Sequence, residues 1–135
     1  MLVLIRFFID LALLRRGPQD LPYSAALLGL LAALSVLIGT INGRQLFGGV
    51  QAAFGANVID LVLSMGLLWV LLQTKGFRAR WQQTASAFLG LGVLAGMIML
   101  LIRTPADALG IVQFAILLDL VVAVWLHVAL GNVLR

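Results

Sequence analysis

Two aspartates stand inside stretches whose other residues suit a lipid bilayer. Asp60 lies in "NVIDLVLSMGLLWVLL" (residues 57–72), and Asp119 lies in "LLDLVVAVWLHVAL" (residues 117–130). An ionised Asp near the centre of a transmembrane helix costs roughly 2.5–3.5 kcal/mol on insertion scales, so it should be protonated, paired or turned toward a polar cavity. These two carboxylates are therefore the leading candidates for chemistry in this sequence.

The two aspartates allow two kinds of role. In the first, they form part of a proton or cation path and share a proton, with His127 as a second titratable group about 12 Å along the helix from Asp119. In the second, they are structural pins that join helices to one another or to a basic residue of a partner. The nearest bases, Arg44 and Arg103, are expected at the opposite ends of the spans. The sequence thus predicts no counter-ion within the chain, which favours a partner.

Other polar side chains fall in the same apolar runs, namely Gln51, Asn57, Ser64 and Gln113. They could line a hydrated gap, although hydrogen bonds between helices explain them more simply. A single His with no second His or Glu nearby does not make a metal site, and the chain has no cysteine, so neither a metal nor a cofactor is expected. We find no catalytic constellation and expect no enzyme activity; an intramembrane enzyme using Asp60, Asp119 and His127 is the remote alternative.

The composition indicates which elements must position these side chains. The chain has 135 residues, of which 63% are hydrophobic and only 10% charged, whereas a globular domain is roughly half apolar and a quarter charged. The net charge of +4 comes from bases scattered at the ends of apolar runs, which is typical of membrane topology and not of a nucleic-acid footprint. The sequence predicts an all-α integral membrane protein that partners the lipid bilayer and binds no nucleic acid.

Four apolar runs are long enough, or nearly so, to cross a bilayer core that needs about 20 helical residues. They lie near Ser24–Ile41, Gly48–Gln73, Trp81–Ile102 and Ala106–Leu130. Residues 23–135 would then form a four-helix transmembrane domain of two tandem hairpins, about 24–73 and about 81–134. In "TPAD" (residues 104–107), Thr104 can cap the fourth helix and Pro105 suits its first position.

The N-terminal segment differs from these spans. Residues 1–22 carry a short apolar run interrupted by Arg6 and Asp10, which predicts an amphipathic helix lying at the membrane interface, followed by a linker. With four spans, most of the nine bases fall on the side of both termini: Arg6, Arg15, Arg16, Lys75, Arg78, Arg80 and Arg135. Only Arg44 and Arg103 fall on the other side, so both termini are expected in the cytoplasm, in a bacterial type of inner membrane.

The two hairpins resemble each other in sequence. Gly29 aligns with Gly90 in the first helices; in the second helices "GGVQAA" (48–53) matches "GIVQFA" (110–115), and "IDLVLS" (59–64) matches "LDLVVA" (118–123) after a gap of about three residues. Gln51 then corresponds to Gln113 and Asp60 to Asp119. The pattern predicts a parallel repeat about an axis along the membrane normal, with the two aspartates at similar depth.

Small residues accompany each aspartate when the helices are read in steps of four. These residues are Gly48, Ala52, Ala56, Asp60 and Ser64 in the second span, and Ala115, Asp119, Ala123, His127 and Gly131 in the fourth. Small residues at this spacing let helices approach closely, so both aspartates are predicted on packing faces. Gly92 and Gly96 form a GxxxG pattern in the third span, where packing within the chain is favoured over self-dimerisation.

The leading functional hypothesis is a non-enzymatic accessory or scaffold subunit. Such a subunit would pack with itself or with a larger membrane complex through the small-residue and aspartate stripes of the second and fourth spans. The alternative is a small proton- or cation-coupled transporter or channel centred on Asp60 and Asp119. Because the sequence contains neither a soluble domain nor a complete site, it favours the first hypothesis.

Overall fold

The described part of the chain is helical throughout. The computed structural model describes residues 2–13, 15 and 17–133, which form α1 (Leu2–Ala12), α2 (Ala25–Gly43), α3 (Val50–Thr74), α4 (Trp81–Leu109) and α5 (Val112–Val133), with short 3-10 turns at Pro18–Asp20 and Arg78–Arg80. Within these residues, three segments are long and apolar enough to cross a membrane, Ala25–Gly43, Val50–Thr74 and Arg78–Pro105, and α5 contains the shorter apolar segment Ile116–Ala129. The predicted helical class and its apolar helices are thus confirmed.

The ends of the long helices follow local signals in the sequence. Ser24 begins α2, because its hydroxyl oxygen accepts a hydrogen bond from the Leu27 amide at 3.2 Å. The reversal between α2 and α3 requires Gly48 at φ 75° and Gly49 at φ 153°, and the reversal between α4 and α5 requires Gly110 at φ 69°. Residues with a side chain rarely adopt these conformations, so the glycines determine where the chain turns.

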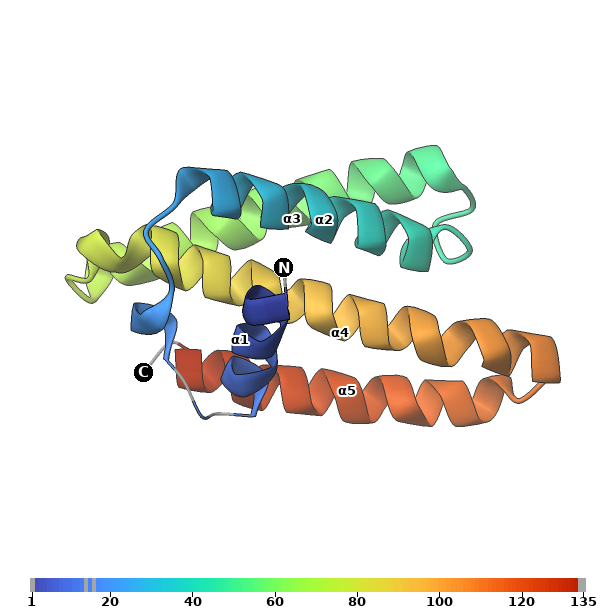
Figure 1. Cartoon of the computed structure of the whole chain (residues 1–135). Helices are drawn as coiled ribbons and strands as arrows, with labels where there is room; N and C mark the ends of the chain where they lie inside the picture. The colour runs from blue at the N-terminus through green and yellow to red at the C-terminus, as the bar shows by residue number, and fades with distance from the viewer. Residues whose placement is uncertain (1, 14, 16, 134–135) are drawn as a thin grey trace.

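In Figure 1, α2 lies in front of α3, and α4 and α5 run beside them, with α4 next to α2 and α5 beyond it. The inner helices α2 and α4 pack on each other, while α3 packs mainly on α2 and α5 mainly on α4. Each hairpin therefore contributes one inner and one outer helix. Helix α1 crosses α4 and α5 at a steep angle (Figure 1).

Helix α4 is the centre of the packing. Its first half is buried on nearly every side and is built from small residues: Thr84, Ala85, Ser86, Ala87 and Gly90. A side chain at Gly90 would collide with the ring of Phe8 in α1, and one at Gly96 would come within 2.6 Å of Ile38 Cγ2 in α2. Small residues let neighbouring backbones approach, so α4 can contact α1 on one face and α2 on another.

The predicted N-terminal helix is present, and its apolar face packs on protein. Phe7, Phe8, Leu11 and Ala12 of α1 are buried in the main core. The following linker is held to α4, because Gln83 Nε2 donates a hydrogen bond to the Leu21 carbonyl at 2.8 Å. The face that was expected to meet lipid thus meets α4 and α5 instead.

The predicted start of the fourth helix at "TPAD" is wrong. Helix α4 continues through Pro105 to Leu109, and α5 begins only at Val112. The Thr104 hydroxyl donates to the Leu100 carbonyl of the preceding turn at 2.8 Å instead of capping a new helix. Proline removes one backbone donor, which an apolar helix tolerates when neighbouring groups compensate, and Gly110 supplies the actual reversal.

Candidate functional site

Asp119 has a counter-ion within the chain. Arg103 Nε and Nη2 both donate to Asp119 Oδ2, at 2.8 and 2.5 Å, and the Asp119 side chain is only 15% exposed. The prediction that no base faces this carboxylate is therefore wrong. The error follows from the helix boundary: once α4 runs to Leu109, Arg103 lies inside the second hairpin and faces α5.

Asp60 has no such counter-ion. It is exposed on α3 and makes no hydrogen bond or ion pair with any residue that the structure describes. Its side chain lines a hollow of about 300 Å³ between the helices, together with Ser35, Ser64, Phe88, Leu89, Gly92 and Leu126. We call this space the Asp60 hollow. It combines one carboxylate and two hydroxyl groups with apolar surroundings.

The Asp60 hollow and α1 lie on different faces of α4. Gly90 meets Phe8 of α1, whereas Gly92 lines the hollow, and a Cβ added at Gly92 would have no neighbouring atom within 4 Å. Two residues along a helix turn the side-chain direction by about 200°, so these glycines face nearly opposite ways. Residues of α2, α3, α4 and α5 therefore line the hollow, whereas α1 packs on the other face of α4.

The two aspartates are associated with different parts of α4. Asp60 shares its hollow with Gly92, whereas Asp119 contacts Arg103, further along the same helix. Eleven residues of α4 separate these two points, which corresponds to about 16 Å of helix rise. The similar depth of the two aspartates stays a prediction, while the Asp119 carboxylate is engaged by Arg103.

His127 stands apart from both carboxylates. It is exposed on α5, and its Nδ1 lies 2.7 Å from the Ala123 carbonyl of the preceding turn. Because a carbonyl only accepts, Nδ1 carries the proton in this contact. Its neighbour Leu126 lines the Asp60 hollow, but His127 does not.

The remaining predicted polar residues divide into three environments. Asn57 is half-buried; its Nδ2 donates to the Ala53 carbonyl at 2.7 Å, and its amide lies against Gly39 of α2. Ser64 lines the Asp60 hollow. Gln51 and Gln113 are exposed near the turns that precede their helices, so they are not brought to the aspartates.

The small-residue stripe predicted on α3 lies at the edge of the face that packs within this chain, and its packing on a partner stays a prediction. Ala52 is exposed and Ala56 half-buried, whereas Ala53 is fully buried; Gly48 lies in the turn before the helix. The predicted stripe is offset by one residue, about 100° around the helix, from the face that packs within the chain. The residues that face the other helices are Ala53, Asn57, Leu61, Met65, Leu68 and Leu72. Asp60 therefore lies at the edge of the packing face and not at its centre.

The small residues that were predicted on packing faces of the other helices lie in different environments. Gly96 packs against Ile38 within the chain, as favoured, while Gly92 lines the hollow. Asp119 and Ala123 are half-buried on the face of α5 that meets α4. Gly131 is exposed, and the side chain of Ala115 lies outside the described residues.

Sequence reasoning missed two residues that the fold makes important. Asn42, at the end of α2, donates from Nδ2 to the Gly96 carbonyl of α4 at 3.1 Å, and its Oδ1 is buried without a partner in the described part of the chain. Ser35 lines the Asp60 hollow. Nothing in the local sequence distinguishes Asn42 or Ser35, because both roles arise from contacts between hairpins.

Within residues 2–13, 15 and 17–133, no three His, Asp or Glu side chains gather where they could share a metal ion.

Comparison with known proteins gives no family. The chain matches no family model, and neither a curated protein nor a solved structure is detectably similar to it. Any function must therefore be inferred from the geometry itself.

Proposed function

We propose that this protein is a non-enzymatic accessory or scaffold subunit of four transmembrane helices, with both termini in the cytoplasm, that binds a partner in the membrane. The partner is a transmembrane helix that places one Arg or Lys side chain in the Asp60 hollow. The observation that carries this proposal is the contrast between Asp119, which Arg103 neutralises, and Asp60, which has no partner among the described residues.

The outer surfaces of the helix layer support a membrane environment. Large apolar side chains are exposed along α3 (Phe54, Ile59, Val62, Leu63, Leu67 and Val70) and along α5 (Ile116, Leu117, Leu120, Val121, Val124 and Val128). Exposing so much apolar surface to water is unfavourable in free energy, whereas lipid chains or another apolar helix cover it without that penalty. A four-span topology follows if α5 also crosses the bilayer.

Asp60 then needs a neutralising group from outside the chain. A carboxylate at this depth is costly when ionised, and a basic side chain from a neighbouring helix removes most of that cost. The hollow offers room for one long side chain, and the Ser35 and Ser64 hydroxyls offer further acceptors beside the carboxylate. Apolar residues around the hollow would exclude water from the ion pair.

A second candidate function rests on the same oxygen atoms. Asp60, Ser35 and Ser64 together present a carboxylate and two hydroxyl groups, which suit a proton or a small cation. A path that also uses Asp119 is not supported, because Arg103 already pairs with that carboxylate. A cation-coupled carrier would therefore depend on Asp60 alone.

Co-purification from native membranes tests the first proposal. The protein carrying Asp60→Leu, or Asp60→Asn, should lose its partner because neither side chain retains the charge. Asp20→Asn is the matched control: it removes a carboxylate from the linker outside the helix layer and should leave the partner bound. A protein that is monomeric and alone before any substitution would refute the proposal.

Flux measurements separate the second function from the first. In proteoliposomes, a carrier should show cation- or pH-driven flux that Asp60→Asn abolishes and Asp119→Asn does not. A scaffold subunit should show no flux in any variant, while partner binding still depends on Asp60.

A further inference from the structure

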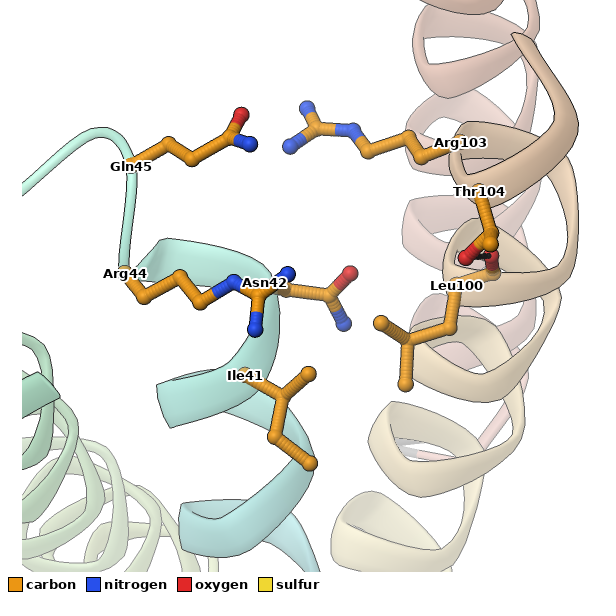
Figure 2. Close-up of a pocket in the computed structure, with 7 residues that line it drawn as sticks. All are labelled: Ile41, Asn42, Arg44, Gln45, Leu100, Arg103 and Thr104. Carbon is orange, nitrogen blue, oxygen red and sulfur yellow. Dashed lines mark hydrogen bonds between the residues drawn. The ribbon is translucent and has the colours of Figure 1, made fainter. Parts of the chain in front are cut away.

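A second hollow lies at the other end of the inner helices, between the end of α2 and α4. It has a volume of about 90 Å³ and is lined by Ile41, Asn42, Arg44, Gln45, Leu100, Arg103 and Thr104. Figure 2 shows the side chains of Arg103 and Gln45 pointing toward each other across it, with Arg44 and Asn42 on the α2 side. The hollow is roughly three times the ~30 Å³ that one water occupies in the liquid, which suits one small polar group.

Some of the arginine N–H donors around this hollow already make hydrogen bonds, and others do not. Arg44 has no hydrogen bond or ion pair among the described residues, so its whole guanidinium is available. Arg103 uses Nε and Nη2 on Asp119 Oδ2, which leaves Nη1 without a partner in the described part of the chain. Arg44 and Nη1 of Arg103 thus present positively charged donors that no described residue uses.

The walls of the hollow are held at a fixed separation. Asn42 Nδ2 donates to the Gly96 carbonyl, and Gly96 itself packs against Ile38, so the end of α2 is tied to α4 just below the arginines. A site whose walls are already positioned loses little entropy when it binds a ligand.

The position of the hollow at the end of a membrane-spanning helix indicates which ligand it would bind. Arg44 directly follows α2, so in a membrane-spanning layer it stands where an apolar span meets the lipid headgroups. Guanidinium groups match phosphate oxygens in geometry and charge, and basic pockets at helix ends bind anionic headgroups.

We propose that Arg44 and Arg103, with the Gln45 amide, bind a phosphate group, in the form of a phospholipid headgroup or of free phosphate. The site goes beyond the proposed function, because it needs no partner at Asp60 and faces the side of the membrane opposite the termini. Arg103 thereby has two roles: its Nε and Nη2 neutralise Asp119, and Nη1 binds the phosphate.

Lipid titration of the full-length protein tests this site. Native mass spectrometry would compare phosphatidylglycerol with diacylglycerol of the same acyl chains, and inorganic phosphate would be added as competitor. We expect phosphatidylglycerol to bind and diacylglycerol not to, and Arg44→Gln to weaken binding by about tenfold or more. Arg103→Lys, which keeps the charge facing Asp119 but loses the planar fork, should weaken it less.

The control is Arg78→Gln, which removes an exposed arginine from the opposite end of the layer and should leave phosphatidylglycerol binding unchanged. Displacement of the lipid by millimolar phosphate, or phosphate binding without lipid, would identify the phosphate group alone as the ligand. Equal binding of phosphatidylglycerol and diacylglycerol, or binding unaffected by Arg44→Gln, would overturn the proposal. Helical circular dichroism of each variant shows that it is folded.

Discussion

The two hairpins of this protein place the same motif in different electrostatic surroundings. In the hairpin of α4 and α5, the aspartate of "LDLVVA" faces Arg103 of its own hairpin. In the hairpin of α2 and α3, the aspartate of "IDLVLS" lines an open hollow and faces no described base. A matching sequence segment therefore does not determine whether a carboxylate is neutralised. That depends on whether the neighbouring helix places a basic side chain beside it.

The alignment of the hairpins shows where they diverge. When Gly29 is matched with Gly90, Arg103 falls opposite Asn42, which carries no charge and is occupied with the Gly96 carbonyl. The turns also differ, since residues 44–49 join α2 to α3 whereas only residues 110–111 join α4 to α5. Asp60 is consequently ten residues into its helix and Asp119 seven, and this shift moves Asp119 toward the turn. The repeat itself stays a prediction.

The largest effect is expected from breaking the internal ion pair. Arg103→Leu leaves the half-buried Asp119 without a counter-ion and should lower the free energy of unfolding by about 2 kcal/mol, less than the roughly 3–5 kcal/mol expected for a fully buried pair because Arg103 is 45% exposed. Denaturant titration in mild detergent measures this loss. Asp60→Leu should cause no comparable loss, because no described partner is removed.

The double variant sharpens this comparison. Arg103→Leu with Asp119→Leu removes both charges and should recover most of the stability that Arg103→Leu loses. If the double variant is no more stable than Arg103→Leu, then Arg103 supports the fold through packing and the two hairpins do not differ in the way described.

The next effect concerns the contact between the hairpins. Gly96→Leu should destabilise the protein by about 1–2 kcal/mol, because its side chain would displace Ile38 and break the hydrogen bond from Asn42. Gly92→Leu is the matched control on the same helix: it projects into the Asp60 hollow, where no atom lies within 4 Å of a Cβ, and should cost much less. Equal losses in thermal unfolding would contradict the assignment of Gly96 to the interface and Gly92 to the hollow.

The sequence predicts much of the fold because lipid-suited helices have a strong signature. The apolar run predicted from Ser24 located α2 closely. The signal at Pro105 misled, since in an apolar helix proline does not have to end the helix. That one boundary put Arg103 at the end of a span and hid its contact with Asp119.

The candidate site was predicted only in part, for a related reason. Asp60 and Ser64 were identified from their types, but the hollow that they line depends on how α2, α4 and α5 approach α3. Reading α3 in steps of four also placed Asp60 on the packing face, whereas the residues that pack within the chain, Asn57 and Leu61 among them, stand one position further along the helix. Residue type and spacing therefore found the carboxylates, and only the packing showed which one is free to bind.

The smallest effect comes from supplying Asp60 with a base of its own. Ser35→Lys places an ammonium group in the Asp60 hollow and should make the first hairpin resemble the second. We expect a favourable coupling between Lys at position 35 and Asp60 of about 1 kcal/mol, measured as a double-mutant cycle with Asp60→Asn. Ser35→Gln, which has similar length and no charge, is the control and should show no coupling. Because the new lysine would occupy the place proposed for the partner's basic side chain, Ser35→Lys should also release the partner in co-purification.

If the lysine couples to Asp60 but the partner stays bound, the partner binds elsewhere on the protein. If the double-mutant cycle shows no coupling, Asp60 does not face the hollow as an ionised carboxylate.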